Sequence, residues 1–433
     1  MLFIEKQIGI KQFLEGKAMY VLFTGYYFDG FHGSMLHICE MSEYFSQNGF
    51  KCYCASVFVN DYIVEYCKKR NLIVLKANEI PINIEYEYVF SYHFPILPYL
   101  IGRGLKYKKI IIGCLSSFHP LELPLDIYSN CTLLTVVSEE AKQNLLRHSI
   151  SKINIFLLKN FIPRQFSEGE FHPSANIKKI AVVSNHPPSE ILELPKFLSN
   201  ISVDFWGSGQ KHYSAITPKI LSQYDVVISI GKTVQYCLGM GIPVFVYDYM
   251  GGNGYVKPDT LDKEEYFNFS GRSSRRKLEG IFLANEIITN YQQACKDVAI
   301  LKKIAIERYS LDCNMKKLLS IINQSEQCHI DLEKYSVEIE HYSWLLGELL
   351  CLYDNKSKNE ANLCISRMEL KNINEAYFSI KSNIKKKNDE IDDLKCHISK
   401  IENSHFYKFA KRYYFIRDKI IKFLNFIKYK IIK

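Results

Sequence analysis

Residues 224–256, with the sequence YDVVISIGKTVQYCLGMGIPVFVYDYMGGNGYV, decide the fold that we predict for this chain. The segment opens with an apolar run of strand length at 226–230, and the turn at 231–233 leads into a helix that Gly241 and Pro243 end. A second apolar run follows at 244–247. A strand, a helix and a strand within about thirty residues are typical of a βαβ unit, whose parallel strands are buried on both faces.

The turn that starts this helix has the chemistry of a phosphate site. Gly231, Lys232 and Thr233 bring backbone N–H groups, the positive end of a helix dipole and a mobile cation together. It is not a Walker loop, because that motif needs a glycine where this chain has Val226. The alternative is a surface turn whose lysine is only solvated. A second glycine cluster at 251–254 follows the next strand, and ligands bind at the carboxyl ends of strands in open α/β sheets, which favours a ligand site.

The same segment resembles the carboxyl-terminal domain of two-domain, metal-independent (GT-B type) glycosyltransferases, especially bacterial enzymes that build surface polysaccharides. The resemblance lies in a helix stop that is followed by a strand and a Gly-Gly loop. The residues that match this pattern are Gly241, Pro243, Val244, Gly251 and Gly252. The family-four branch also has two glutamates eight residues apart before the helix stop. This chain has Ile228 and Tyr236 at those places, with Gln235 adjacent. The resemblance therefore implies either a divergent branch that holds its donor through an amide and backbone groups, or a protein that has lost activity.

Alternating strand-like and helix-like segments predict an α/β fold with two facing Rossmann-like domains. The strands predicted for the first domain are 20–24, 51–59, 72–75, 88–92, 109–114 and 133–137. A segment rich in proline, glycine and polar residues at 160–176 interrupts this pattern, which resumes with strands at 180–184 and 203–205. We expect an extension at 1–17, a first (acceptor) domain at 18–165 and a second (nucleotide-sugar donor) domain at 166–325.

The last hundred residues change in character. Apolar residues at spacings of three and four run from Leu332 to Tyr353 and again from Tyr377 to Ile401, which predicts a helical hairpin or coiled coil over 326–404. A hairpin would pack on the body of the protein, whereas a coiled coil over 330–401 would join copies of the chain, and the sequence leaves both open.

The tail at 405–433 has nine Lys or Arg residues against the single Asp418 and an apolar, aromatic face. These features are typical of a basic amphipathic helix on an anionic membrane, and a helix docked on a protein is the alternative. Since the whole chain has a net charge of +9, subtracting eight for the tail leaves the rest near neutral, which argues against a nucleic-acid partner.

Composition and the amino terminus indicate a cellular location. No apolar run reaches the ~18 residues that span a bilayer, and 1–18 lacks the apolar region of a signal peptide. No C-x-x-C pair occurs among the 13 cysteines, which argues against a zinc ribbon or a thioredoxin-like centre. We expect a reduced, cytoplasmic protein, attached peripherally to the inner face of the cell membrane through its tail.

Histidines are the candidates for a catalytic base. The loop after the first predicted strand carries Gly30, His32, Gly33 and Ser34, and the resemblance implies that this loop lines the cleft as an acceptor or cleft loop. His32 is the predicted base for the acceptor hydroxyl. His93 and His119 are alternatives, and each of the three could instead be an ordinary loop histidine.

Transfer of a sugar from a nucleotide sugar releases a diphosphate, whose charge the protein must neutralise. No Asp-x-Asp pair follows a predicted strand, so we expect no metal and no cofactor beyond the nucleotide-sugar co-substrate. The predicted donor-binding residues are Gly231, Lys232, Thr233, Gln235, Gly251, Gly252, His186 and Arg272. The predicted function is transfer to a growing, lipid-linked surface glycan. A nucleotide-sugar epimerase of the same fold and a non-catalytic coiled-coil assembly protein are the alternatives.

Overall fold

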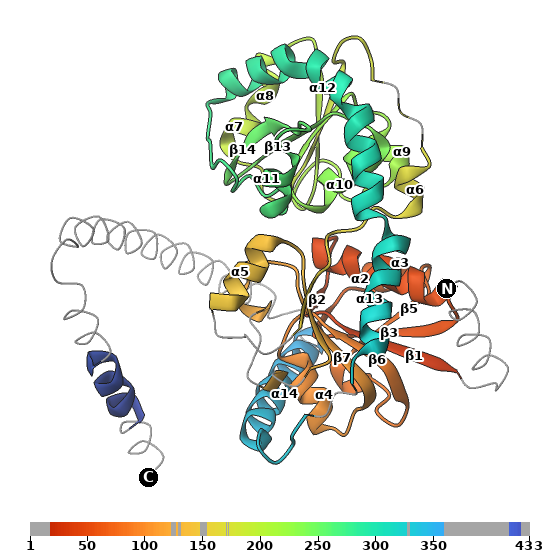
Figure 1. Ribbon diagram of the computed structural model, residues 1–433, viewed down its shortest axis with the longest axis vertical. Helices are drawn as coiled ribbons and strands as arrows, with labels where there is room; N and C mark the ends of the chain where they lie inside the picture. The colour runs from red at the N-terminus through yellow and green to blue at the C-terminus, as the bar shows by residue number, and fades with distance from the viewer. Residues whose placement is uncertain are drawn as a thin grey trace. The chain divides into compact units, whose positions relative to one another are not determined.

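The computed structural model describes residues 18–122, 127–128, 131–147, 154–169, 171, 173–326, 330–358 and 415–425 (Figure 1). The predicted extension at 1–17 and the part of the predicted coiled coil from 359 to 404 lie outside the described residues. The chain divides into two units, residues 1–353 and 354–433, which are described separately.

The first domain is built on a seven-stranded parallel sheet with the order β5-β3-β1-β6-β7-β8-β9. Its strands are β1 (Met19–Thr24), β3 (Phe50–Ser56), β5 (Leu72–Lys76), β6 (Glu85–Ser91), β7 (Lys106–Cys114), β8 (Leu133–Val136) and β9 (Ile155–Leu157). All six predicted strands are confirmed, and β9 is an addition. Because the strand order reverses between β1 and β6, the loops after these two strands open the crevice where ligands bind in such sheets.

Helices and short elements complete the first domain. The helices are α2 (Gly33–Gln47), α3 (Asp61–Lys68), α4 (Ile96–Gly102) and α5 (Glu139–Arg147), with 3-10 turns η1 (Ala77–Glu79) and η2 (Pro120–Glu122). The two-residue strands β2 (Tyr27–Phe28) and β4 (Phe58–Val59) pair beside the main sheet. Nine of the fifteen residues of α2 are buried, including the charged Glu40 and the polar His37. This helix therefore faces more than its own sheet.

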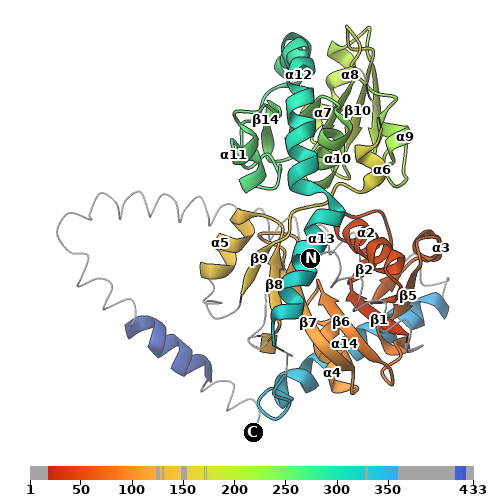
Figure 2. The same ribbon diagram turned by 45° about the vertical axis from the view of Figure 1, so that its right-hand side comes forward.

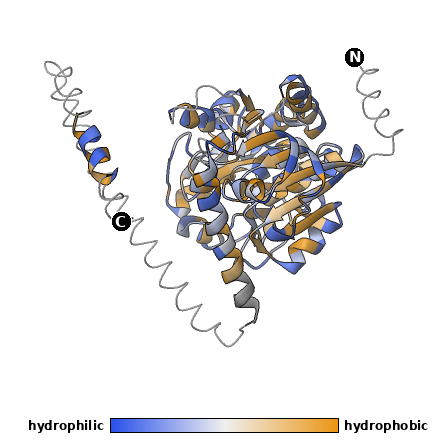
Figure 3. Cartoon of the chain, turned by 90° about the horizontal axis from the view of Figure 1, so that it is seen from below, coloured by the Kyte–Doolittle hydropathy of each residue, from blue (hydrophilic) through white to orange (hydrophobic). Residues whose placement is uncertain are grey.

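The second domain contains the predicted βαβ unit. Its five-stranded sheet has the order β11-β10-β12-β13-β14. The strands are β10 (Lys179–Val183), β11 (Ser202–Trp206), β12 (Val226–Ser229), β13 (Val244–Asp248) and β14 (Gly251–Tyr255). Helix α10 (Lys232–Met240) connects the parallel pair β12 and β13, and Gly241 ends it in the left-handed region with φ 78°. Figure 3 shows hydrophobic residues concentrated on the strands of the sheets.

The glycine cluster predicted as a loop is instead the edge strand β14, which pairs antiparallel with β13. A Cβ on Gly252 would lie 1.8 Å from the carbonyl oxygen of Val246, and a Cβ on Gly251 would lie 2.3 Å from that of Arg276. The glycines therefore permit close approach of protein backbone. The predicted donor-binding role of Gly251 and Gly252 stays a prediction.

The remaining helices cover the second sheet and then return to the first. The short helices are α6 (Arg164–Ser167), α7 (Ser189–Leu192), α8 (Leu194–Phe197), α9 (Pro218–Leu221) and α11 (Leu261–Tyr266). Helix α12 (Gly280–Tyr309) runs along the second domain, and α13 (Leu311–Gln324) continues onto the first (Figure 2). The two segments that connect the domains are joined by a hydrogen bond, in which the N–H of Ile162 donates to the carbonyl oxygen of Tyr309 at 2.7 Å.

Helices after the second sheet pack on the first domain. Helix α13, predicted within the donor domain, buries Met315, Leu318 and Ile322 in the core of the first domain. Helix α14 (Ser336–Lys358) likewise packs there through Leu346 and Leu350, among others. The described part of the predicted hairpin or coiled coil therefore packs on its own chain.

The second unit contributes one described helix, at 415–425, within the predicted amphipathic tail. Its apolar side chains are exposed, among them Phe415 (63%), Phe423 (62%) and Leu424 (58%). Among the helices that the structure describes, none has the length and apolar character to cross a membrane.

Candidate functional site

A first cavity, of about 370 Å³, lies at the carboxyl ends of the strands of the second sheet. Asp248 at the end of β13 is buried in its wall and accepts hydrogen bonds from the Ser184 hydroxyl (2.9 Å) and the Tyr249 N–H (2.7 Å). Burial raises the pKa of Asp248, while these hydrogen bonds lower it. Asn185 and His186, which follow β10, complete this side. The sheet edge thus presents polar groups to a ligand, as the topology predicts.

Aromatic rings from both domains line the same cavity. They are Phe31, Trp206, Tyr213, Tyr236 and Tyr249. The N–H of Phe31 donates to the Tyr213 hydroxyl at 2.9 Å, which joins the β1–α2 loop to the second domain. Gly30 allows this approach, because a Cβ there would lie 2.4 Å from the Tyr213 oxygen. Flat rings beside a few polar groups suit a planar heterocycle such as a nucleobase.

A second cavity, of about 570 Å³, lies at the carboxyl ends of the strands of the first sheet. Most of its wall comes from the loops after β1, β6 and β7, and the second domain contributes the start of α10 and Asn268. Its polar lining includes Asp29, His32, Ser34, His93, Ser116, His119, Glu122 and Asn160.

The two cavities share Gly33 and Lys232 in their walls. Gly231 precedes α10 with φ 59° and ψ −131°, a conformation that glycine adopts without strain. The first N–H groups of α10, including those of Lys232 and Thr233, have no acceptor within the helix. The positive end of α10 therefore lies at the boundary between the cavities, where it suits an anion that reaches into both.

Lys232 is a buried ion-pair partner rather than the mobile cation that the sequence predicts. It is 8% exposed, and its ammonium pairs with the carboxylate of Glu40 on α2. The Tyr236 hydroxyl donates to the other oxygen of the same carboxylate. Burial raises the pKa of Glu40, and the charge of Lys232 opposes that effect. His37, one turn earlier on α2, stacks on Phe161 at 4.7 Å, and burial lowers its pKa well below the ordinary value.

Most of the predicted site residues meet at these cavities. Thr233 and His186 line the first cavity, and Gly231, His32 and Ser34 line the second. His32 Nε2 lies 2.9 Å from Asp29 Oδ1, and both side chains are nearly half exposed. The proposed catalytic role of His32 stays a prediction.

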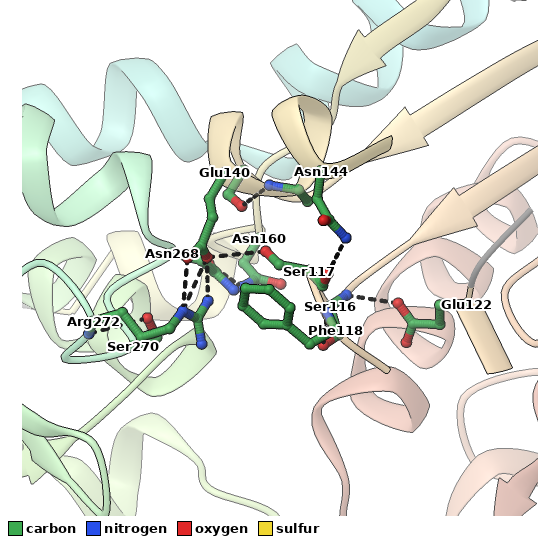
Figure 4. A network of polar contacts seen from close by, with 12 residues as sticks. Ser116, Ser117, Phe118, Glu122, Glu140, Asn144, Asn160, Asn268, Ser270 and Arg272 are labelled. Atoms are coloured by element: carbon green, nitrogen blue, oxygen red, sulfur yellow. Dashed lines mark hydrogen bonds and ion pairs between the residues drawn. The ribbon is translucent and has the colours of Figure 1, made fainter. Parts of the chain in front are cut away.

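Four predicted donor-binding residues lie outside both cavities: Gly251 and Gly252 in β14, and Gln235 and Arg272. Gln235 is buried, and when its amide is turned by 180° the nitrogen lies 2.5 Å from the carbonyl oxygen of Gly231, a bond that would secure the turn before α10. Arg272 donates to both carboxylate oxygens of Glu140 at 2.9 and 3.0 Å, and its guanidinium lies over the Phe118 ring (Figure 4). This bond joins the second domain to α5, and the predicted role of Arg272 at the donor stays a prediction.

The sequence treated His93 and His119 separately and missed Glu122, which completes a compact cluster in the second cavity. The ligand-type atoms of these three residues lie within 4.8 Å of one another. Burial lowers the pKa of His93 to about 3 and raises that of Glu122 to about 8. The nearest signal in the sequence was the motif FHPLE, in which His119 and Glu122 are three residues apart.

The proton positions in this cluster do not suit a metal ion. His93 Nδ1 accepts a hydrogen bond from the Tyr26 N–H at 2.8 Å, and His119 Nδ1 accepts one from the Leu121 N–H at 3.3 Å. A neutral imidazole that accepts at Nδ1 carries its proton on Nε2. Metal-binding histidines show the opposite arrangement, with a lone pair directed at the metal and an N–H directed away from it. The two histidines therefore act as hydrogen-bond donors toward the cavity.

A scan against protein-family models finds no match, and no curated protein matches the chain. A search of solved structures finds a glycosyltransferase from Rickettsia africae, with 15% identity and a TM-score of 0.47 over 71% of this chain and 98% of its own. The lipopolysaccharide outer core galactosyltransferase WaaB has 12% identity and a TM-score of 0.45 over 70% and 99%. A protein from Listeria monocytogenes named as a candidate UDP-N-acetylglucosamine 2-epimerase has 11% identity and a TM-score of 0.44 over 71% and 96%. At these identities and scores, the likenesses decide nothing about the reaction.

Proposed function

We propose that the protein is a glycosyltransferase that moves a sugar from a nucleotide sugar to a glycan acceptor without a metal ion. One observation carries the proposal: the N-terminus of α10 lies between an aromatic cavity and a polar cavity, and Gly33 and Lys232 line both. A nucleotide sugar has a heterocycle at one end, a sugar at the other and a diphosphate between them. Its three parts match the three parts of the site.

In this arrangement the nucleobase binds among the aromatic rings of the first cavity. The diphosphate binds the N–H groups at the start of α10, where the helix dipole and the Lys232 ammonium neutralise the charge that develops as the sugar leaves. The sugar and the acceptor hydroxyl then meet in the second cavity, beside His32 and the cluster around Glu122.

The basic tail supports a lipid-linked acceptor of a surface glycan as the finer form of this proposal. The exposed apolar residues of the helix at 415–425 suit the headgroup region of a membrane. Each tail cation near an anionic surface contributes roughly 1 kcal/mol. We propose peripheral attachment to the inner face of the cell membrane. We also propose self-association through the part of 330–401 that follows α14.

Nucleotide binding tests the proposal directly. Isothermal titration of the full chain with UDP, GDP, TDP and CMP should detect micromolar binding of at least one, and incubation with the corresponding nucleotide sugar should release the nucleotide. Release of an epimerised nucleotide sugar would instead identify an epimerase. Neither binding nor turnover with any of them would refute the proposal.

A steric variant tests the location of the site. A Cβ on Gly33 meets no atom within 4 Å, so Gly33→Leu should fold normally while its side chain enters the shared wall of the cavities. Gly347→Leu is a matched control, since Gly347 lies in α14 and a Cβ there also meets no atom within 4 Å. We expect at least a hundredfold loss of nucleotide affinity in the Gly33 variant alone. Equal affinity in the two variants would place the nucleotide elsewhere.

A further inference from the structure

The cluster of His93, His119 and Glu122 contains a single proton acceptor that is directed at the second cavity. Glu122 ends η2, and its side chain is 5% exposed. One carboxylate oxygen, Oε2, accepts a hydrogen bond from the Ser116 N–H at 2.6 Å (Figure 4). The other, Oε1, lies 3.7 Å from His93 Nε2. Since Glu122 lines the second cavity, Oε1, the oxygen that Ser116 does not occupy, is the one that we assign to a substrate.

Neither His93 nor His119 can be this proton acceptor. Both carry their proton on Nε2, because backbone N–H groups occupy both Nδ1 atoms. Burial is the main cause that lowers the pKa of each ring, so both stay neutral near pH 7. Their Nε2–H groups can donate hydrogen bonds to sugar or acceptor oxygens, but they cannot remove a proton from them.

The remaining candidate in the same cavity is His32, which the sequence favours. Its Nε2 is engaged by Asp29, and it lies at a nearly half-exposed position where water screens the pair. Glu122 is buried, and desolvation brings its pKa to about 8, close to the working range of a general base. A buried titratable group in a cleft, with a strongly shifted pKa, is a frequent sign of catalysis.

We propose that Glu122 is the catalytic base of the transfer reaction, and this assignment rests on the function proposed above. Oε1 takes the proton of the acceptor hydroxyl while the acceptor oxygen forms a bond to the anomeric carbon. The bond between that carbon and the diphosphate oxygen breaks at the same time. Its electron pair leaves with the diphosphate, which the start of α10 stabilises. A single displacement of this kind inverts the anomeric configuration.

The groups that face Glu122 do not change charge in the range of interest. They are His93, His119, Cys114 and Tyr92. Burial lowers the pKa of His93 and His119, and it raises the pKa of Cys114 and Tyr92 well above their ordinary values. All four are neutral between pH 7 and 8.5, so a titration in kcat/KM in this range reports Glu122.

The test compares Glu122→Gln with Glu87→Gln, the same chemical change at the ion pair with Lys108 outside both cavities. The probes are UDP-glucose, UDP-N-acetylglucosamine and GDP-mannose. The assay follows the nucleoside diphosphate that is released when the sugar is transferred to water or to an alkyl glycoside. We expect Glu122→Gln to lose about 10²–10⁴-fold in kcat, as is usual when a general base is removed. Its affinity for the nucleoside diphosphate should stay within threefold, which also shows that the variant is folded.

The pH profile separates a base from a structural residue. Wild-type kcat/KM should rise with pH through a midpoint near pH 8 and level off above it, and Glu122→Asp should keep a rising limb at reduced rate. Glu122→Gln should lack that limb. Turnover of Glu122→Gln within threefold of wild type, or a product with retained configuration, would overturn the assignment of the base and leave the proposed function intact. Absence of turnover in the wild type with every probe would refute both.

Discussion

The buried pair of Glu40 and Lys232 makes a measurable prediction about stability as well as about binding. Both side chains are less than one-tenth exposed, and they come from different domains. Removing one partner of a buried ion pair typically costs about 3–5 kcal/mol, because the other charge is left without compensation. At about 2–4 °C per kcal/mol, Lys232→Met should therefore lower the Tm by about 6–20 °C.

The pH dependence of this loss has a definite sign. Burial raises the pKa of Glu40 above 4.5 in the folded protein, and removal of Lys232 removes the main opposing influence. An acid with a raised folded pKa binds more protons when folded, so its contribution to stability is complete below the unfolded pKa and is lost as pH rises. Lys232→Met should thus be nearly as stable as wild type near pH 4.5 and least stable at alkaline pH.

The double variant Glu40→Gln with Lys232→Met completes the cycle. It removes both charges, while the amide oxygen introduced on α2 remains an acceptor for the Tyr236 hydroxyl, so thermal unfolding should return to within about 1 kcal/mol of wild type. Lys232→Met and the double variant should both bind nucleotide more weakly than wild type, because both lack the cation at the start of α10. Equal Tm values for wild type and Lys232→Met at pH 8 would refute the pair. Wild-type nucleotide affinity in the double variant would remove Lys232 from the site.

Three further predictions concern other groups. In thermal unfolding, Glu122→Gln should be as stable as wild type below pH 4.5 and more stable than wild type above pH 8. The reason is that a rise of the Glu122 pKa from 4.5 to about 8 means that ionising this carboxyl destabilises the folded wild type by about 5 kcal/mol. A stability difference that stays constant across pH would contradict the burial of its charge. Arg272→Gln should lose about 1–3 kcal/mol of stability with its bonds to Glu140, yet bind nucleoside diphosphates within threefold of wild type; a thirtyfold loss of affinity would restore its predicted role at the donor. A chain ending at residue 404 should bind phosphatidylglycerol vesicles at least about a hundredfold more weakly, since each tail cation contributes roughly 1 kcal/mol, while nucleotide release stays unchanged. Unchanged binding in a vesicle flotation assay would refute the anchor proposal.

The sequence predicts the sheets well, because parallel strands buried on both faces are continuous apolar runs. The predicted runs at 226–230 and 244–247 correspond to β12 and β13, and the helix stop at Gly241 is correct. The edge strand β14 was missed because glycines at 251–254 are equally typical of a ligand loop, and only the packing against Val246 distinguishes the two.

The candidate site is harder to predict, since it depends on contacts between distant residues. The sequence selected Lys232, which lines both cavities, but it predicted a mobile cation where the structure has a buried ion pair. Its partner Glu40 is 192 positions away, on a helix whose other residues are mostly apolar, and an acid on such a face is a weak signal without the partner. The partner of Arg272 was missed for the same reason, because Glu140 lies 132 positions away.

These contacts also explain why the two domains form one site. The bonds from Phe31 to Tyr213, from Glu40 to Lys232 and Tyr236, and from Glu140 to Arg272 all join the first domain to the second. Burying charge costs desolvation energy, so such pairs specify which surfaces meet more than they add to net stability. Both cavities take walls from both domains, and Glu40 holds Lys232 in the wall that they share. Variants of Glu40 should therefore alter nucleotide binding and turnover together.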